Sequence, residues 1–466
     1  MNFSAFAKRL FRRTENNLRK SRLKILIVII FSVIASMLLS GCILRISADD
    51  LYRLPQVSED YLRLQGHINA IINEGAEFAP PISGPNRQSV QLKDLTGNGI
   101  NEVIAFFRIP GYSTLKIYVF EMIDGDYSVA MIIEGAGTAI ESIRYVDMNG
   151  DGNLEIIVGW QLGDALKYME IYSIIDFDPQ LLAGAEYEGI SIFDINNDRN
   201  DDIIIVRLPT PESSAIAKIF TLCEDRDIQI SQVNLSAGIE TISRVIRGTL
   251  IGGEPAIFIE SEGRFYEGSF ITDVLALRND EFTNISLRQI SGISEQTVRQ
   301  RRILSADLGG DNIIKIPSPR RLYSPGETAY YVMDWYSFAI NGASRLEMTT
   351  YHNPIDEWFL ILPLDWRERV AVRREDVVSG ERTVIFSYIP GVGGSVEDFL
   401  SIHRLTGDAR ESRSALPGRV RLTSEGTVVY AFELLAPKNS FGLTFDEETI
   451  SENFRLIFSD WLAGTF

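Results

Sequence analysis

The chain has 466 residues, 45% of them hydrophobic and 10% aromatic, so it can bury a large core and is long enough for two or three domains, or for one large β array with a small module. Its formal net charge is −18; the first 41 residues carry eight Lys/Arg and one Glu, so the remainder has 37 basic and 62 acidic residues, a net −25. Nucleic-acid binding needs clustered cations, so we expect no nucleic-acid partner. An acidic body suits an extracellular domain that binds cations.

The first 42 residues have the layout of a secretory signal. Residues 1–24 are basic, residues 25–39 form an uncharged apolar run, and Leu39-Ser40-Gly41-Cys42 follows at once. This ending resembles a bacterial lipobox, which implies that residues 1–41 are a lipoprotein signal peptide and that Cys42 carries the lipid. Residues 43–466 are then extracytoplasmic and lipid-anchored to the bacterial cell membrane. The alternative is an uncleaved signal anchor, although the apolar run is shorter than the roughly 20 residues that span a bilayer.

Residues 42–87 are predicted to be a tether with one short helix. Apolar residues recur at helical spacing over 58–72, and Pro80-Pro81 ends regular structure. From residue 89 onward, short apolar runs and polar turns predict strands. Residues 117–120 and 128–133 flank Asp124-Gly125-Asp126 and predict a hairpin.

An Asp-rich loop of nine residues occurs three times. Loop 1 (94–102), loop 2 (147–155) and loop 3 (194–202) start 53 and 47 residues apart, and an apolar run follows each. Oxygen-bearing side chains stand at positions 1, 3, 5 and 9. They are Asp94, Thr96, Asn98 and Glu102 in loop 1, Asp147, Asn149, Asp151 and Glu155 in loop 2, and Asp194, Asn196, Asp198 and Asp202 in loop 3. A repeat of this length cannot bury its apolar face alone, so it predicts a stacked or circular array.

Later copies of the repeat have lost these side chains. Loop 4 (247–255) aligns with loop 2 and keeps the apolar strand at 256–259, but Arg247 stands at position 1. Loop 5 (307–315) keeps Asp307 and Asp311 and has Lys315 at position 9. Residues 358–364 are interpreted as the corresponding strand of a sixth copy. The average repeat of about 53 residues holds four short strands and their turns.

Residues 381–466 interrupt the repeat. Strands are predicted at 382–389 and 427–435, and apolar residues at helical spacing predict a helix over 446–462. We interpret this region as a small α+β module; alternatively, some of its strands close the array.

The loops have the chemistry of a calcium site. Oxygen ligands at positions 1, 3 and 5, a position-7 carbonyl and a position-9 carboxylate suit Ca²⁺ better than zinc or copper. The pattern resembles the FG-GAP or VCBS-type repeat of integrin-like β-propellers over roughly residues 90–365. The resemblance implies an all-β fold, a β-propeller of six or seven four-stranded blades over 88–380, whose loops hold structural Ca²⁺.

The resemblance also implies that the carbonyls of Ile100, Asn153 and Asn200 are ligands. Loop 3 departs from the family pattern, because Arg199 stands where glycine is usual. Loops 4 and 5 are expected to hold no metal, since Arg247 and Lys315 would repel a cation. The alternative for all the loops is a set of Asx-rich turns without an ion.

The sequence contains no recognisable catalytic motif. His67, His352 and His403 lack metal-ligand spacing and a nearby Ser or Cys motif. The tryptophans Trp160, Trp335, Trp358 and Trp366 are expected to pack between repeats. The alternative is that they line a surface for carbohydrate or peptide. The basic run 299–302 is expected to lie on a solvated face.

We therefore expect a non-catalytic binding or scaffold protein at the cell envelope rather than an enzyme. Its partners would be the membrane, through the lipid, and an envelope protein or glycan ligand. One alternative is an extracellular hydrolase or lyase acting on glycans, which requires acids, Tyr or His that converge on one face. Another is a sensor whose C-terminal helix docks a partner.

Overall fold

The computed structural model describes residues 59–457, except 110, 112–113, 136, 224–225, 266–267, 301–302, 323–329, 377 and 391–394. The predicted signal peptide and Cys42 lie outside the described residues. The chain divides into two units after Gly66, and every described strand lies in the second. The predicted tether helix is confirmed as α3 (Glu59–Asn73). Within the described ranges, no helix is long and apolar enough to cross a membrane.

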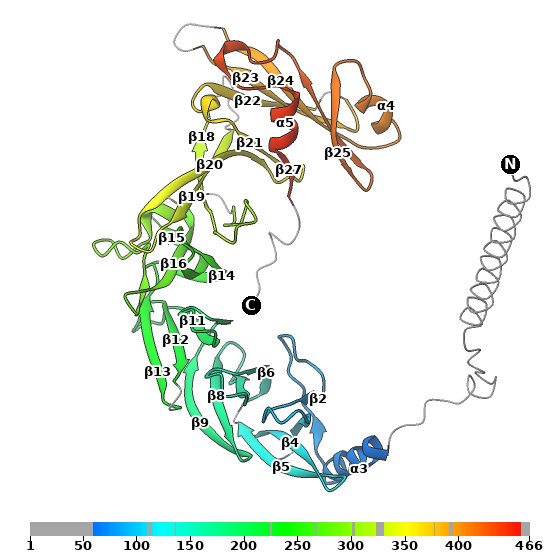
Figure 1. The fold of residues 1–466 in the computed structure, drawn as a ribbon, viewed down its shortest axis with the longest axis vertical. Coiled ribbons are helices and arrows are strands. Elements are labelled where there is room, and N and C mark those ends of the chain that lie inside the picture. The colour runs from blue at the N-terminus through cyan, green and yellow to red at the C-terminus, as the bar shows by residue number, and fades with distance from the viewer. Residues whose placement is uncertain are drawn as a thin grey trace, which may run out of the picture. The chain divides into compact units, whose positions relative to one another are not determined.

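The described strands form six antiparallel sheets, which confirms the all-β class (Figure 1). Sheet 1 contains β1 (Glu77–Phe78), β2 (Val90–Lys93), β3 (Glu102–Arg108), β4 (Leu115–Ile123) and β5 (Asp126–Gly135). Sheet 2 contains β6 (Ala139–Val146), β7 (Glu155–Gln161), β8 (Lys167–Ile175) and β9 (Asp178–Glu186). Sheet 3 contains β10 (Gly189–Phe193), β11 (Asp202–Arg207), β12 (Ile216–Leu222) and β13 (Ile228–Asn234).

The remaining sheets follow in chain order, apart from one late strand. Sheet 4 contains β14 (Ile239–Thr249), β15 (Pro255–Phe265), β16 (Gly268–Arg278) and β17 (Glu281–Asn284). Sheet 5 contains β18 (Ile316–Arg321), β19 (Tyr331–Phe338), β20 (Ser344–Asn353), β21 (Trp358–Leu362) and β27 (Phe454–Leu456). Sheet 6 contains β22 (Val370–Glu375), β23 (Glu381–Tyr388), β24 (Glu397–Leu405), β25 (Arg419–Glu425) and β26 (Val428–Leu434).

The hairpin predicted at 117–133 is formed by β4 and β5. Asp124 and Gly125 both have positive φ, 51° and 83°, as a two-residue type I′ turn requires. Two-residue turns with positive φ also join β8 to β9 and β16 to β17. The twist of these turns matches that of the flanking strands, so the last two strands of sheets 1, 2 and 4 form the same kind of tight hairpin.

Consecutive sheets share a hydrophobic core. Successive side chains of β7 and of β15 point alternately toward the preceding and the following sheet. In β7, Ile156 packs with sheet 1 and Ile157 with sheet 3. In β15, Ile257 packs with sheet 3 and Phe258 with sheet 5. Successive side chains of a strand point to opposite faces, so a strand covered on both faces becomes a continuous apolar run. Each fully buried side chain of this kind contributes about 1.5–3 kcal/mol.

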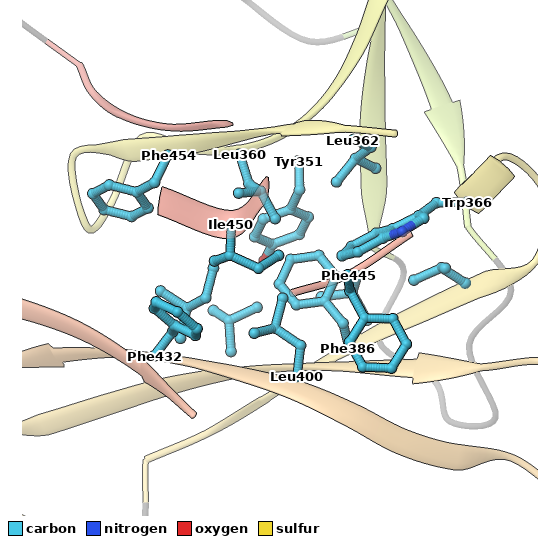
Figure 2. Packing of buried hydrophobic residues seen from close by; sticks show 14 of the residues in the cluster. Tyr351, Leu360, Leu362, Trp366, Phe386, Leu400, Phe432, Phe445, Ile450 and Phe454 are labelled. Atoms are coloured by element: carbon cyan, nitrogen blue, oxygen red, sulfur yellow. The ribbon is translucent and has the colours of Figure 1, made fainter. Parts of the chain in front are cut away.

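Sheets 5 and 6 share the largest of these cores. Figure 2 shows part of it, with Leu360 and Leu362 of β21 facing Leu400 and Phe432 of sheet 6. The four tryptophans singled out from the sequence are at most 2% exposed, which confirms that they pack inside the protein. Trp366, in a short 3₁₀ turn (Leu364–Trp366), meets Phe399 edge to face at 4.9 Å.

Two predicted elements are wrong. Residues 358–362 form β21, the strand after β20 in sheet 5, and not the loop-following strand of a sixth copy. The helix predicted over 446–462 is only α5 (Glu447–Asn453), and β27 follows it directly. Phe454 fits a helical stripe, but the open edge of β21 offers backbone partners, and Phe454 stacks on Trp358 there. Residues 458–462 of that prediction lie outside the described residues.

Sheet 6 is apolar on one face and largely polar on the other. Its apolar face joins the core with sheet 5, while α4 (Arg410–Ser414) contacts β24, β25 and β26. Glu381, Ser401 and His403 line a cavity on the second face. The predicted boundary at 380/381 falls between β22 and β23, which are neighbours in this sheet. The short turns not yet placed are the 3₁₀ elements Glu295–Thr297 and Ser440–Gly442.

A buried ionic cluster fixes the segment between sheets 4 and 5. Glu260 of β15 is fully buried and accepts hydrogen bonds from Arg244, Arg299 and the Ser305 backbone N–H at 2.6–3.0 Å. Arg299 also lies over the Phe270 ring, 4.4 Å from its centroid. The expectation that 299–302 lies on a solvated face is therefore wrong for Arg299, because a charge partner 39 residues away compensates its burial.

Candidate functional site

The loops occupy equivalent places in their sheets. The residue before each loop pairs with its position-9 residue, as Lys93 with Glu102, Val146 with Glu155, and Phe193 with Asp202. In loop 5 the same pairing is the bridge from Ala306 to Lys315. Loop 4 differs, because β14 continues to Thr249, which pairs with Pro255. Loop 4 is thus a shorter hairpin and not a ligand-depleted copy of the same loop.

Loops 1–3 share one backbone conformation held by their acidic side chains. The position-1 aspartate accepts the position-6 N–H at 2.8–3.1 Å, from Gly99, Gly152 and Arg199 in turn. Positions 4 and 6 both have positive φ in every one of these loops, and Asn197 and Arg199 take the places of glycine in loop 3. Arg199, at φ 78°, therefore keeps the turn at a backbone cost that glycine avoids.

The position-9 carboxylates are buried. Glu102, Glu155 and Asp202 are at most 2% exposed, and each accepts the N–H of position 2 of its own loop at 2.7–3.2 Å. Burial raises the pKa of all three, and the charges of the neighbouring loop aspartates raise it further; the pKa of Asp202 reaches about 6. Negative charge is therefore concentrated where no solvent stabilises it.

The loops differ in how this charge is compensated. In loop 2, Arg226 donates to Asp151 at 2.9 Å. Burial alone would raise the pKa of Asp151, but hydrogen bonds from Asn153 and Asn149 and the charge of Arg226 hold it below its usual range. In loop 1, the Thr96 hydroxyl at position 3 is buried without a hydrogen bond. A buried oxygen without a hydrogen bond at a predicted ligand position is consistent with a site that binds a cation.

Loop 3 carries the least compensated charge. Asp194, Asp198 and Asp202 stand at positions 1, 5 and 9, and none of them forms an ion pair within the described residues. Among those residues, no three His, Cys, Asp or Glu side chains are gathered closely enough to hold a metal ion as they stand. The carboxylates of Asp194, Asp198 and Asp202 instead accept hydrogen bonds from backbone N–H groups of loop 3.

Loop 5 contains a cation of its own. The side chain of Lys315 is 4% exposed, and its Nζ lies 2.9 Å from Asp311, 3.0 Å from the Ile313 carbonyl and 3.8 Å from Asp307. These oxygens belong to positions 5, 7 and 1. The loop thus arranges its oxygens around a positive charge that the chain itself supplies, and the Lys315 hydrogen bond lowers the pKa of Asp311.

Loops 1–3 also contact one another. The Leu154 N–H donates to the Leu95 carbonyl at 2.8 Å, which ties loop 2 to loop 1. A Cβ on Gly97 would lie 2.4 Å from the Gly152 carbonyl, and one on Gly150 would lie 2.7 Å from the Asn200 side chain. The loops therefore form a continuous row across sheets 1–3, and the backbone contact at Gly97 leaves no room for a larger residue.

A second polar site was not expected from the sequence. On β24, the Ser401 hydroxyl lies 2.9 Å from Nε2 of His403, whose Nδ1 lies 3.1 Å from Glu381 on β23. These residues border a cavity of about 260 Å³. Ser401 and His403 are two apart in a strand, so they share a face; that alternation was the available signal. The sequence shows no serine motif near His403, and the contact with Ser401 is a finding of the structure.

This cluster resembles a nucleophile, base and acid in its order of contacts. Burial, together with the charge of Arg419, lowers the pKa of His403 to about 4, so the imidazole is neutral at pH 7. The Arg419 side chain also binds Glu381. The strand N–H groups around Ser401 belong to the ladders with β23 and β26, so they do not offer an oxyanion hole.

Comparisons with known proteins give no family assignment. A scan against protein-family models finds no match, and a search of curated proteins finds no similar sequence. The geometry of the loops and of the second site therefore carries the functional argument.

Proposed function

We propose that this chain is an extracytoplasmic, lipid-anchored binding or scaffold protein whose loops 1–3 bind structural Ca²⁺. Loop 5 is the observation that carries the calcium proposal. It surrounds the Lys315 ammonium with oxygens of positions 1, 5 and 7, while loops 1–3 keep a carboxylate at position 9 in place of the lysine. A loop with the same register and an acid at position 9 needs its cation from solution.

The predicted ligands fit Ca²⁺ in chemistry. The oxygens would come from Asp147, Asn149, Asp151, Glu155 and the Asn153 carbonyl in loop 2, from the equivalent loop 3 residues with the Asn200 carbonyl, and from Asp94, Thr96, Asn98, Glu102 and the Ile100 carbonyl in loop 1. The bound ion would supply positive charge. We expect loop 3 to bind most tightly, because three carboxylates there lack a basic partner, whereas Arg226 already pairs with loop 2.

The row of loops supports a structural role for the ion rather than a catalytic one. The loops lie at the junction of sheets 1–3, and loops 1 and 2 share a backbone hydrogen bond. An ion in each loop would neutralise repulsion between acids that must stay close together. A rigid array held in this way presents side chains for binding an envelope protein or a glycan, while a lipid on Cys42 would keep it at the membrane.

Calcium titration of the soluble 43–466 fragment tests this proposal. Filling one site to 100 times its Kd stabilises the fold by about 2.7 kcal/mol, so the melting temperature should rise with Ca²⁺ and fall with chelator. Mg²⁺ at the same ionic strength is the control. The variant Asp194→Asn/Asp198→Asn should lose part of the shift, and an unchanged melting temperature in the wild type would reject calcium binding.

We also propose that the six sheets are blades of a propeller. Their consecutive order, their shared cores and the repeated place of the loops support this arrangement. A ring of six would bring the polar face of sheet 6 to sheet 1. Small-angle scattering of the 43–466 fragment tests closure, because a ring is more compact than an open array of the same sheets; a radius of gyration matching the open array would refute it.

A second candidate function is hydrolysis of an ester, favoured by the Ser401–His403–Glu381 contacts. This chemistry suits acyl transfer, whereas glycosidic cleavage needs a pair of carboxyl groups. An active-site-directed fluorophosphonate should label the wild type and spare Ser401→Ala, while the buried Ser387→Ala serves as control. Absence of labelling in the wild type would reject ester hydrolysis, and binding would remain as the proposed function.

A further inference from the structure

A cavity of about 560 Å³ lies beside the first strands of three consecutive sheets. Arg144 of β6, Ile190, Ser191 and Ile192 of β10, and Arg247 of β14 line it, together with the 84–85 turn. Its size is typical of pockets that bind small ligands. Because three repeats contribute to it, the pocket is a property of the array and not of one sheet.

The two arginines in this cavity lack acidic partners. The Nε of Arg144 is buried without a hydrogen bond, and Arg247 uses Nη1 to donate to the Ile192 carbonyl at 2.8 Å. Neither guanidinium is paired with a carboxylate in the described part of the chain, although acidic residues outnumber basic ones by 63 to 45. Burial lowers the pKa of Arg144, and the like charge of Arg247 lowers it further.

Arg144 is half-buried without an acidic partner, and the exposed Arg247 places a like charge near it, so Arg144 costs folding energy unless an anion binds there. A half-buried cation without a partner is destabilising, and arginine is the side chain best suited to hold carboxylate or phosphate through paired hydrogen bonds. Ile190 and Ile192 add apolar surface to the same wall. The combination fits a small molecule with an anionic end and a less polar body.

We propose that this cavity, the anion pocket, binds a small organic anion through Arg144 and Arg247, with a carboxylate or phosphate group as the recognised feature. The inference deepens the proposed binding role and rests on it, because it names the class of ligand. It does not depend on calcium, since none of loops 1–3 contributes to the lining.

Calorimetric titration of the 43–466 fragment with inorganic phosphate and with glucuronate tests the anion pocket. The titrations are run at constant ionic strength and saturating Ca²⁺, so that an unfilled loop cannot cause a failure. Saturable binding is expected for at least one probe, and the preferred probe distinguishes phosphate from carboxylate ligands. In Arg144→Gln/Arg247→Gln the affinity should fall roughly tenfold to a hundredfold.

Arg264→Gln is the matched control, because Arg264 is exposed on β15 and pairs with Glu240 outside the pocket. It should bind like the wild type. Arg247→Gln alone changes an exposed residue and keeps the test valid if the double variant does not fold. No saturable binding of either probe, or equal binding by the wild type and Arg247→Gln, would overturn the proposal; a calcium-dependent melting temperature would still stand.

Discussion

Asp202 provides a test of whether loop 3 is built to hold a cation. Its carboxylate is 2% exposed, and burial raises its pKa from 3.8 to about 6. The folded protein then binds this proton more tightly than the unfolded chain. Stability from this group is present below about pH 4 and is lost as the pH rises to about 6. A shift of about two pKa units corresponds to about 3 kcal/mol at pH 7.

Asp202→Asn removes that cost, because an amide cannot ionise. Its oxygen can still accept the Ile195 N–H, and its NH₂ can donate to Thr221, which now donates to Asp202. In chelator at pH 7 the variant should be more stable by up to about 3 kcal/mol, a rise of roughly 5 °C in melting temperature. In saturating Ca²⁺ the order should reverse, because the variant has lost a charged ligand.

The assay is thermal unfolding of the 43–466 fragment at pH 4, 5.5 and 7, in chelator and in Ca²⁺. Asp201→Asn is the control, since Asp201 is exposed at position 8 of the same loop and is not a predicted ligand. The difference between Asp202→Asn and the wild type in chelator should vanish near pH 4. A variant that melts below the wild type in chelator at pH 7 would show that the carboxylate is a net stabilising acceptor, and the argument for a missing cation would fail.

Three further predictions concern the internal cations and the anchor. Lys315→Glu should lower the melting temperature in chelator, and Ca²⁺ should restore it. Lys315→Met should lack this restoration by Ca²⁺. Identical behaviour of the two variants would contradict the interpretation that Lys315 takes the place of a metal ion in loop 5. Glu260→Gln should cost about 3–5 kcal/mol in urea unfolding, because Arg244 and Arg299 lose their shared counter-charge, and Glu262→Gln, half-buried on the same strand, should cost less. Cys42→Ser should abolish incorporation of labelled fatty acid, and continued labelling would exclude lipidation at that residue.

The sequence predicts the loops well because their chemistry is local. Positions 1 to 9 determine the turn, and the apolar run after each loop follows from strands covered on both faces, as Ile156 and Ile157 illustrate. Residue spacing does not reveal how a neighbouring element completes a site. Arg226 reaches Asp151 from 75 residues away, and Arg299 reaches Glu260 from 39.

Both errors concern which strands pair with each other. The helix predicted over 446–462 ends before Phe454, because the open edge of β21 pairs with Phe454. Residues 358–362 belong to sheet 5, because they pair with β20. At residues 454–456, pairing with a strand distant in sequence outweighed local periodicity; at 358–362 the strand itself was predicted, and its hairpin with β20 placed it in sheet 5. Ser401 and His403 show the opposite case, in which a two-residue alternation was visible in the sequence but gained meaning only with Glu381 on the adjacent strand.

Comparing loops 2 to 5 shows how the negative charge of the loop is compensated in each. In loop 5 the compensating charge is Lys315, and in loop 2 it is Arg226 from the next sheet. Loop 4 is a shorter hairpin without the acidic cluster. Loop 3 retains three acids and no basic partner within the described residues, and its buried acid has the most strongly raised pKa of the three position-9 carboxylates. A position at which the chain supplies a cation in one repeat and only acids in another is where a metal ion most reduces the free energy, so calcium dependence should follow loop 3 first.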